Sequence, residues 1–129
     1  MALWDVEAEP EVKQWIDLLS DDEYLVVEHV VERLLDAPTT LGHPYSSHLG
    51  DGVRELRFIL GHDGNKIRIT YWLTSDRRIV LLTVFRKTRQ REDAQVERAL
   101  LAKKICEGQH EPAPTHETFT RDIRIEEEY

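Results

Sequence analysis

The chain has 129 residues, of which 33% are charged, and a formal net charge of −8. This length fits one domain with its own core, and the single cysteine, Cys106, excludes a disulfide bond within the chain. No stretch approaches the roughly 18 apolar residues of a membrane-spanning helix, and the N-terminus lacks the pattern of a secretory signal. We therefore expect a cytoplasmic protein with no membrane partner.

The first part of the chain predicts a short strand followed by two helices. Apolar and polar residues alternate over residues 4–8, which is typical of a half-buried strand. Apolar side chains spaced three and four residues apart then predict one helix over 12–19 and another over 26–35. Ser20 and Glu23 match a capping box that would begin the second helix. The two helices should form an antiparallel hairpin.

The middle of the chain predicts a loop and then three strands. Residues 37–52 contain two prolines, three glycines and two histidines without periodicity, so we expect a surface loop. Residues 53–60, 66–74 and 79–87 have the alternation of strands and are separated by segments rich in turn residues. The three strands should form an antiparallel meander.

The last part of the chain predicts a helix and a tail. Periodicity over residues 89–106 predicts a helix with Thr88 as its cap, and the prolines and glutamates that follow predict a loosely held acidic tail. Weak alternation over 118–125 allows one more edge strand. The expected organisation is a folded domain at 1–108 and a tail at 109–129. The fold class is α+β, with the first strand and helical hairpin packed on a twisted antiparallel sheet.

Positive charge is concentrated on the predicted sheet. Residues 53–104 carry 13 Lys and Arg against 6 Asp and Glu, a net charge of +7, whereas the flanking segments are acidic. Because successive strand residues point to opposite faces, each strand divides into two sets. The apolar set, which should receive the helices, comprises Leu56, Phe58, Leu60, Ile67, Ile69, Tyr71, Leu73, Val80, Leu82 and Val84. The opposite set comprises Glu55, Arg57, Ile59, Lys66, Arg68, Thr70, Trp72, Ile79, Leu81, Thr83, Phe85 and Lys87.

Three cations of the second set share their face with two aromatic residues. A single exposed strand arginine more often serves solubility, but Arg57, Arg68 and Lys87 would converge beside Trp72 and Phe85. Cations bind phosphates and aromatic rings stack on bases. The face is therefore a candidate surface for single-stranded nucleic acid.

The basic segment at residues 86–91 would extend this surface into the start of the last helix. Helix N-termini favour phosphate because of their unpaired amides and partial positive charge. The alternative interpretation is that these are ordinary surface cations, which could dock the acidic tail of the same chain.

The order and spacing of these segments resemble the RelE/ParE superfamily of bacterial toxins, and in particular the branch of phage-derived proteins related to HigB. The resemblance covers about residues 3–106, and its matching segments are LGDGVRELR at 49–57, IRITY at 67–71, IVLL at 79–82, FRKT at 85–88 and VERA at 96–99.

The resemblance implies the toxin of a type II toxin–antitoxin pair that cleaves messenger RNA on the ribosome, with neither metal nor other cofactor. In that chemistry a ribose 2′-hydroxyl attacks the adjacent phosphodiester, and cations stabilise the developing negative charge. By position, Arg57 and Arg68 would clamp the phosphate, and Lys87 would stabilise charge or protonate the leaving oxygen. The residues expected to bind RNA are Arg86, Arg89, Arg91, Trp72 and Phe85.

The identity of a general base stays open, because the chain departs from the family pattern at two places. Ser47 and His48 stand where many relatives have a basic residue, and Val84 stands where they have a small residue or histidine. His48 is a candidate base, although a loop histidine is more often incidental. Tyr71 falls on the core face and should pack there.

Two other functions stay open, since a fold does not fix a function. One is a ParE-like inhibitor of DNA gyrase without nuclease activity, and the other is a degenerate member that binds its antitoxin or regulates their promoter. The expected partners are a helix-turn-helix antitoxin, the ribosome and messenger RNA, with self-association into a homodimer left open. The acidic tail is a candidate damper that folds over the cationic face.

Overall fold

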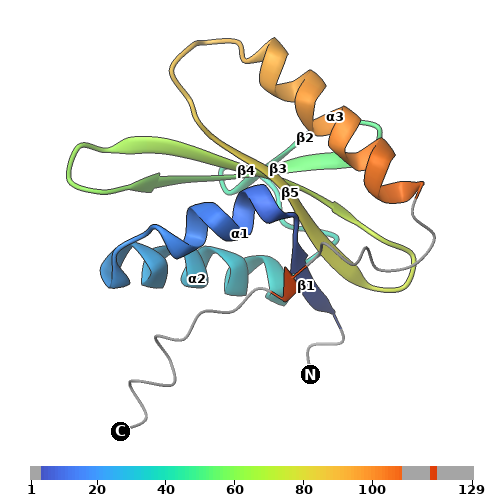
Figure 1. Cartoon of the computed structure of the whole chain (residues 1–129), viewed down its shortest axis with the longest axis horizontal. Helices are drawn as coiled ribbons and strands as arrows, with labels where there is room; N and C mark the ends of the chain where they lie inside the picture. Colours follow the sequence, from blue (N-terminus) through green and yellow to red (C-terminus); the bar gives the residue numbers. More distant parts are fainter. Residues whose placement is uncertain (1–3, 109–116, 119–129) are drawn as a thin grey trace, which may run out of the picture.

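The computed structural model describes residues 4–108 and 117–118, which form one sheet with helices on both faces (Figure 1). The elements in chain order are β1 (Asp5–Ala8), α1 (Pro10–Asp17), α2 (Asp21–Asp36), β2 (Ser46–Gly50), β3 (Val53–Leu60), β4 (Asn65–Leu73), β5 (Arg78–Arg86), α3 (Asp93–Glu107) and β6 (Glu117–Thr118). α1 and α2 cover one face of the sheet and α3 crosses the other (Figure 1). The predicted α+β class is confirmed.

The strand order in the sheet is β2-β3-β4-β5-β1-β6. β3, β4 and β5 form the predicted antiparallel meander, while β1 pairs with β5 in parallel, with Asp5 opposite Arg78 and Ala8 opposite Leu81. β6 then pairs antiparallel with β1. The sheet is therefore mixed: the β1–β5 pair is parallel and the other pairs are antiparallel, and the helical hairpin and β2–β4 lie between β1 and β5 in the sequence.

The helical hairpin begins as the sequence predicts. The hydroxyl of Ser20 accepts a hydrogen bond from the Glu23 amide at 3.2 Å, and the Ser20 amide donates to the Glu23 carboxylate at 2.9 Å. This capping box satisfies two of the amides that the first turn of α2 leaves without helical partners. Pro10 opens α1, where its missing amide proton costs nothing.

The main core lies between the helical hairpin and the sheet. Its most deeply buried members include Val12, Ile16, Tyr24, Val27, Val31, Leu34, Leu56, Ile69 and Tyr71. The hydroxyl of Tyr71 lies 2.7 Å from the hydroxyl of Ser46, so the buried phenol has a partner. The prediction that Tyr71 packs in the core is confirmed.

The loop predicted over residues 37–52 is wrong at its end, where β2 pairs with β3. Ser46 lies opposite Leu56, and the ladder shifts between His48 and Gly50. Gly50, Asp51 and Gly52 then turn the chain into β3 with φ angles of 125°, 50° and 78°. β2 is polar and lacks alternation, so only its pairing with the free edge of β3 defines it as a strand.

The predicted faces of β5 are wrong at four positions because of a β-bulge. Thr70 lies opposite Thr83 but Tyr71 lies opposite Leu81, so Leu82 is an extra residue in β5. An extra residue reverses the side-chain alternation beyond it. Ile79 and Leu81 therefore join the main core, whereas Val80 and Leu82 face α3.

α3 begins later than predicted, and Thr88 is not its cap. The helix starts at Asp93 with Glu92 at the N-cap position, so residues 86–91 precede the helix and do not form its first turn. α3 covers a second, smaller core of Val53, Val80, Leu82, Ala99 and Cys106. Of the strand predicted over 118–125, only Thr118 belongs to the described residues, and it forms β6 with Glu117.

Candidate active site

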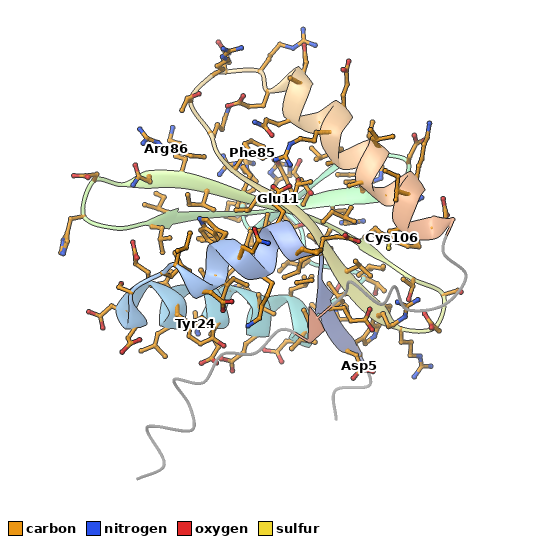
Figure 2. All side chains as sticks on the ribbon, viewed as in Figure 1. Asp5, Glu11, Tyr24, Phe85, Arg86 and Cys106 are labelled. Carbon is orange, nitrogen blue, oxygen red and sulfur yellow. The ribbon has the colours of Figure 1, made fainter. Side chains whose placement is uncertain are left out.

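Strand pairing brings the three predicted cations to one pocket on the α3 face of the sheet. Arg57 lies directly opposite Arg68, and Arg68 lies opposite Phe85. Lys87 follows β5, and its amide donates to the Lys66 carbonyl at 2.7 Å. The pocket has a volume of about 240 Å³ and is lined by Ser47, Leu49, Glu55, Arg57, Arg68, Phe85, Lys87, Gln90, Glu92 and Val96. Figure 2 labels Phe85 near the middle of the sheet and Cys106 near the C-terminal end of α3.

A carboxylate lies between the two arginines of the pocket. The Glu55 Oε2 atom is 3.9 Å from Arg57 Nε and 3.7 Å from Arg68 Nε. Burial raises the pKa of Glu55, and the charges of Arg68, Arg57, Lys87 and His43 only partly oppose that rise. Glu55 is therefore a better proton acceptor, when ionised, than an exposed glutamate.

The two arginines have different surroundings. The Arg68 side chain is 7% exposed, and its Nη1 atom donates to the Ile67 carbonyl at 3.1 Å. Burial lowers the pKa of the Arg68 guanidinium, while Glu55 opposes this change. The Arg57 side chain is 32% exposed, and its buried Nε atom has no hydrogen-bond partner among the described residues. Arg57 is therefore the arginine that can reach a bound phosphate.

His43, which no sequence pattern singles out, contacts Arg57. Its Nδ1 atom lies 3.3 Å from Arg57 Nη1. His48, the histidine considered as a base, is exposed and does not line the pocket, although its neighbours Ser47 and Leu49 do.

The ammonium group of Lys87 is held by the backbone that follows it. It donates to the Gln90 carbonyl at 2.9 Å and also to the Arg89 carbonyl. A lysine ammonium has three protons, so one remains for another acceptor in the pocket.

A second hollow, here called the cationic groove, adjoins the pocket. It has a volume of about 570 Å³ between the β3–β4 turn and the segment after β5, and it is lined by Asp63, Gly64, Asn65, Lys66, Arg86, Lys87, Thr88, Arg89 and Gln90. Lys87 and Gln90 belong to both hollows. Two of the predicted RNA-binding residues, Arg86 and Arg89, therefore lie beside the pocket. Arg91 lines neither hollow and pairs with Asp93 at 3.3 Å.

The two predicted aromatic residues lie in different places. Phe85 lines the pocket and is 9% exposed. Trp72 lies opposite Val53 and Val80 and packs in the smaller core beneath α3, with the Lys103 ammonium 5.2 Å from its ring. Trp72 is separated from the three cations because it lies four residues beyond Arg68 along β4, at the part of the sheet that α3 covers.

Three residues of the site were missed as functional candidates. The strand alternation placed Glu55 on the correct face but assigned it no role, although an acidic residue among strand cations is itself an indication of a functional site. His43 and Glu92 come from loops, and the sequence gives no register for a loop. Among residues 4–108 and 117–118, no group of three or more His, Cys, Asp or Glu side chains could hold a metal ion.

No helix in the described part of the chain has both the length and the apolar character that crossing a membrane requires.

The acidic tail, which we expected to act as a damper, lies outside the described residues except for Glu117 and Thr118. These two pair with β1, which contributes no residue to the pocket.

Comparisons with known proteins agree with the architecture. A free-state structure of a doubly substituted mutant of the E. coli toxin RelE matches with a TM-score of 0.53 and 10% sequence identity, covering 80% of this chain and 98% of that one. This likeness shows a RelE-like fold. A search of curated proteins finds no match.

The family comparison covers most of the chain. Residues 14–104 match the family described as "Phage derived protein Gp49-like (DUF891)". The predicted resemblance to the phage-derived branch of RelE-like toxins is confirmed, and family and fold together support a toxin of a toxin–antitoxin system, with an antitoxin as its partner. The chain thus belongs to the Gp49-like family of phage-derived proteins.

Proposed function

We propose that this protein arrests translation as the toxin of a toxin–antitoxin pair, by cleaving messenger RNA on the ribosome. One observation carries the proposal: Arg57, Arg68 and Lys87, from three different strands or strand ends, line a single pocket that also contains the half-buried carboxylate of Glu55. Cleavage by an internal ribose hydroxyl needs both positive charge at the phosphate and a proton acceptor.

In the proposed reaction, Glu55 accepts the proton of the ribose 2′-hydroxyl. The 2′-oxygen then bonds to phosphorus as the bond from phosphorus to the 5′-oxygen breaks, which leaves a 2′,3′-cyclic phosphate and a 5′-hydroxyl. Lys87 gives a proton to the leaving 5′-oxygen, and Arg57 binds the non-bridging oxygens. Arg68, which is nearly buried, holds Glu55 and adds positive charge from beneath.

The cationic groove is proposed to bind the RNA that flanks the scissile phosphate. Lys66, Arg86 and Arg89 line it, and it opens beside the pocket at Lys87. Arg91 would contact RNA or ribosomal RNA at the rim. Phe85 is the aromatic ring available at the pocket, and Trp72 is not part of this proposal because it packs beneath α3.

This function requires three partners. The ribosome and messenger RNA are the targets. A cognate helix-turn-helix antitoxin would neutralise the protein by covering the pocket or by binding to a surface next to the pocket.

The test uses purified ribosomes programmed with a defined messenger RNA. We expect the wild-type protein to cleave the RNA and to leave cyclic phosphate ends, which mass spectrometry identifies. Arg57→Ala should lower the cleavage rate by about 100- to 1,000-fold, the usual effect of removing one preorganised donor. Lys104→Ala, which removes an exposed cation of α3, should cleave like the wild type.

Intact messenger RNA after incubation with the wild-type protein would overturn the proposal. Growth arrest with intact transcripts and altered DNA supercoiling would instead identify a gyrase inhibitor. Binding to an antitoxin without either effect would identify a degenerate member.

A further inference from the structure

The side chain of Glu92 turns back from the start of α3 to the segment that follows β5. Its Oε2 atom accepts a hydrogen bond from the Thr88 amide at 2.8 Å and another from the Arg89 amide at 3.1 Å. It makes no side-chain capping bond to α3 itself. The two backbone bonds lower the pKa of Glu92, with smaller contributions from the charges of Lys87 and Arg89.

These two bonds close residues 87–92 into a tight loop, here called the Lys87 loop. The amides of the loop point to Glu92, while its carbonyls at Arg89 and Gln90 accept from the Lys87 ammonium. One carboxylate and one ammonium thus fix the same short backbone segment from its two ends. Without Glu92, the loop would lose the partners of two amides, and the carbonyls that hold Lys87 would lose their fixed positions.

The position of this carboxylate is unexpected for a surface that binds RNA. Glu92 lines the pocket together with Arg57 and Lys87, so its charge repels a phosphate there. If the charge were its only effect, removing it would improve both RNA binding and cleavage. The backbone bonds suggest the opposite effect on cleavage, since a preorganised ammonium needs no reorganisation when charge develops.

We propose that Glu92 is a positioning residue, which holds the Lys87 loop closed so that the free proton of the Lys87 ammonium faces the scissile phosphate. The inference rests on the proposed nuclease function and adds to it the group that orients the proton donor. Glu92 itself touches neither the 2′-hydroxyl nor the leaving oxygen.

Two variants of Glu92 separate positioning from charge. Glu92→Ala removes both the charge and the acceptor, whereas Glu92→Gln removes the charge and keeps an oxygen that can accept from the two amides. We expect Glu92→Ala to slow cleavage at saturating RNA by about 10- to 100-fold, the factor that a hydrogen bond to a charged group is worth. Its RNA affinity should not fall, and Glu92→Gln should keep most of the wild-type rate.

The matched control is Glu97→Ala, which removes an exposed carboxylate from the same helix outside the pocket. It should change neither the rate nor the affinity. If Glu92→Ala and Glu92→Gln both cleave at least as fast as the wild type, charge is the whole effect and the inference is overturned.

A second measurement does not depend on activity. Amide hydrogen exchange, followed by NMR, should be at least about tenfold faster at Thr88 and Arg89 in Glu92→Ala, because the bonds that protect them are gone. Unchanged protection would overturn the inference even if cleavage were confirmed. Failure of the wild-type protein to cleave would instead overturn the proposed function, and with it the catalytic part of the inference, while the exchange rates would still report whether Glu92 holds the loop.

Discussion

The two faces of the sheet differ in what they bury. The face under α1 and α2 buries a continuous apolar core, in which the Tyr71 and Ser46 hydroxyls satisfy each other. The face under α3 buries five residues of a smaller core at one end, and at the other end it holds Arg68, Thr70 and Thr83. One face therefore supplies most of the apolar burial, and the other keeps a partly covered surface where charged groups can meet a ligand.

The two faces are connected across the edge of β5, beyond the end of β1. Glu11 of α1, labelled in Figure 2, accepts a hydrogen bond from the Val84 amide at 3.0 Å and also pairs with Arg98 of α3. Arg98 in turn donates to the Val84 carbonyl at 3.3 Å. These contacts give hydrogen-bond partners to the Val84 backbone groups at the edge of β5, next to the pocket. The stability of the fold and the geometry of the pocket are therefore not fully independent at Val84.

Of the substitutions that test the difference between the two faces, one at Glu55 should have the largest effect. Glu55→Gln should lower the cleavage rate by about 100- to 10,000-fold, the usual contribution of a general base. The same variant should melt at a higher temperature than the wild type at neutral pH, because it relieves the burial of an ionised carboxylate. Calorimetry and the ribosome assay measure the two effects, with Glu32→Gln on exposed α2 surface as the control.

The pH dependence follows from the direction of the Glu55 pKa. Since burial raises this pKa in the folded protein, the folded state favours the protonated form. The contribution of protonated Glu55 to the stability of the folded state is fully present below the pKa that Glu55 has in the unfolded chain. It is lost as the pH rises through the pKa of Glu55 in the folded protein, whereas the cleavage rate should increase over the same rise. A stability gain in Glu55→Gln that persists at acidic pH, where Glu55 is protonated, would contradict this account.

Substitutions in the main core, on the face of the sheet under α1 and α2, should change the stability of the protein without changing catalysis. Leu34 is fully buried in the main core, and Leu34→Ala should destabilise the protein by about 2–5 kcal/mol through lost transfer energy and a cavity. Denaturant titration measures the loss, and the cleavage rate per folded molecule should stay that of the wild type. Leu25→Ala, on the outer side of the same helix, should cost much less. A reduced rate in folded Leu34→Ala protein would break the separation of the two faces.

A smaller effect is expected at the start of α2. Ser20→Ala removes the hydroxyl that accepts from the Glu23 amide, and should cost about 1 kcal/mol of unfolding free energy. Ser75→Ala, in the exposed β4–β5 turn, is the comparison variant and should be close to neutral. Equal stabilities of the two variants would show that the capping box does not matter for the whole fold.

The smallest effect is expected in the cationic groove. Arg86→Ala should weaken RNA binding modestly and reduce the slope of log affinity against log salt by about 0.7, the value for one phosphate contact on a single strand. The cleavage rate at saturating RNA should not change. Fluorescence anisotropy with a labelled oligonucleotide at several salt concentrations measures the slope. An unchanged slope would remove Arg86 from the RNA-binding surface.

Local patterns predicted the elements that depend on neighbouring residues. The capping box at Ser20, the period of α2 and the exact bounds of β3 follow from residues close together in sequence. The alternation in β3 and β4 also placed Arg57 and Arg68 on one face, because the β3–β4 register continues without a bulge. The order of segments was sufficient to identify the family.

Long-range pairing decided the rest. β2 became a strand because it pairs with β3, and the bulge at Leu82 exchanged the faces of half of β5. Glu92, His43 and the Lys87 loop entered the site through backbone geometry that no periodicity encodes.

The sequence by itself determined the α+β class, the helical hairpin and the concentration of cations on one sheet face, since each follows from spacing along the chain. Only the tertiary structure decided which groups surround those cations and how far each is buried. The physical reason is that a carboxylate such as Glu55 acquires its raised pKa from burial, and burial depends on what the folded chain places above it.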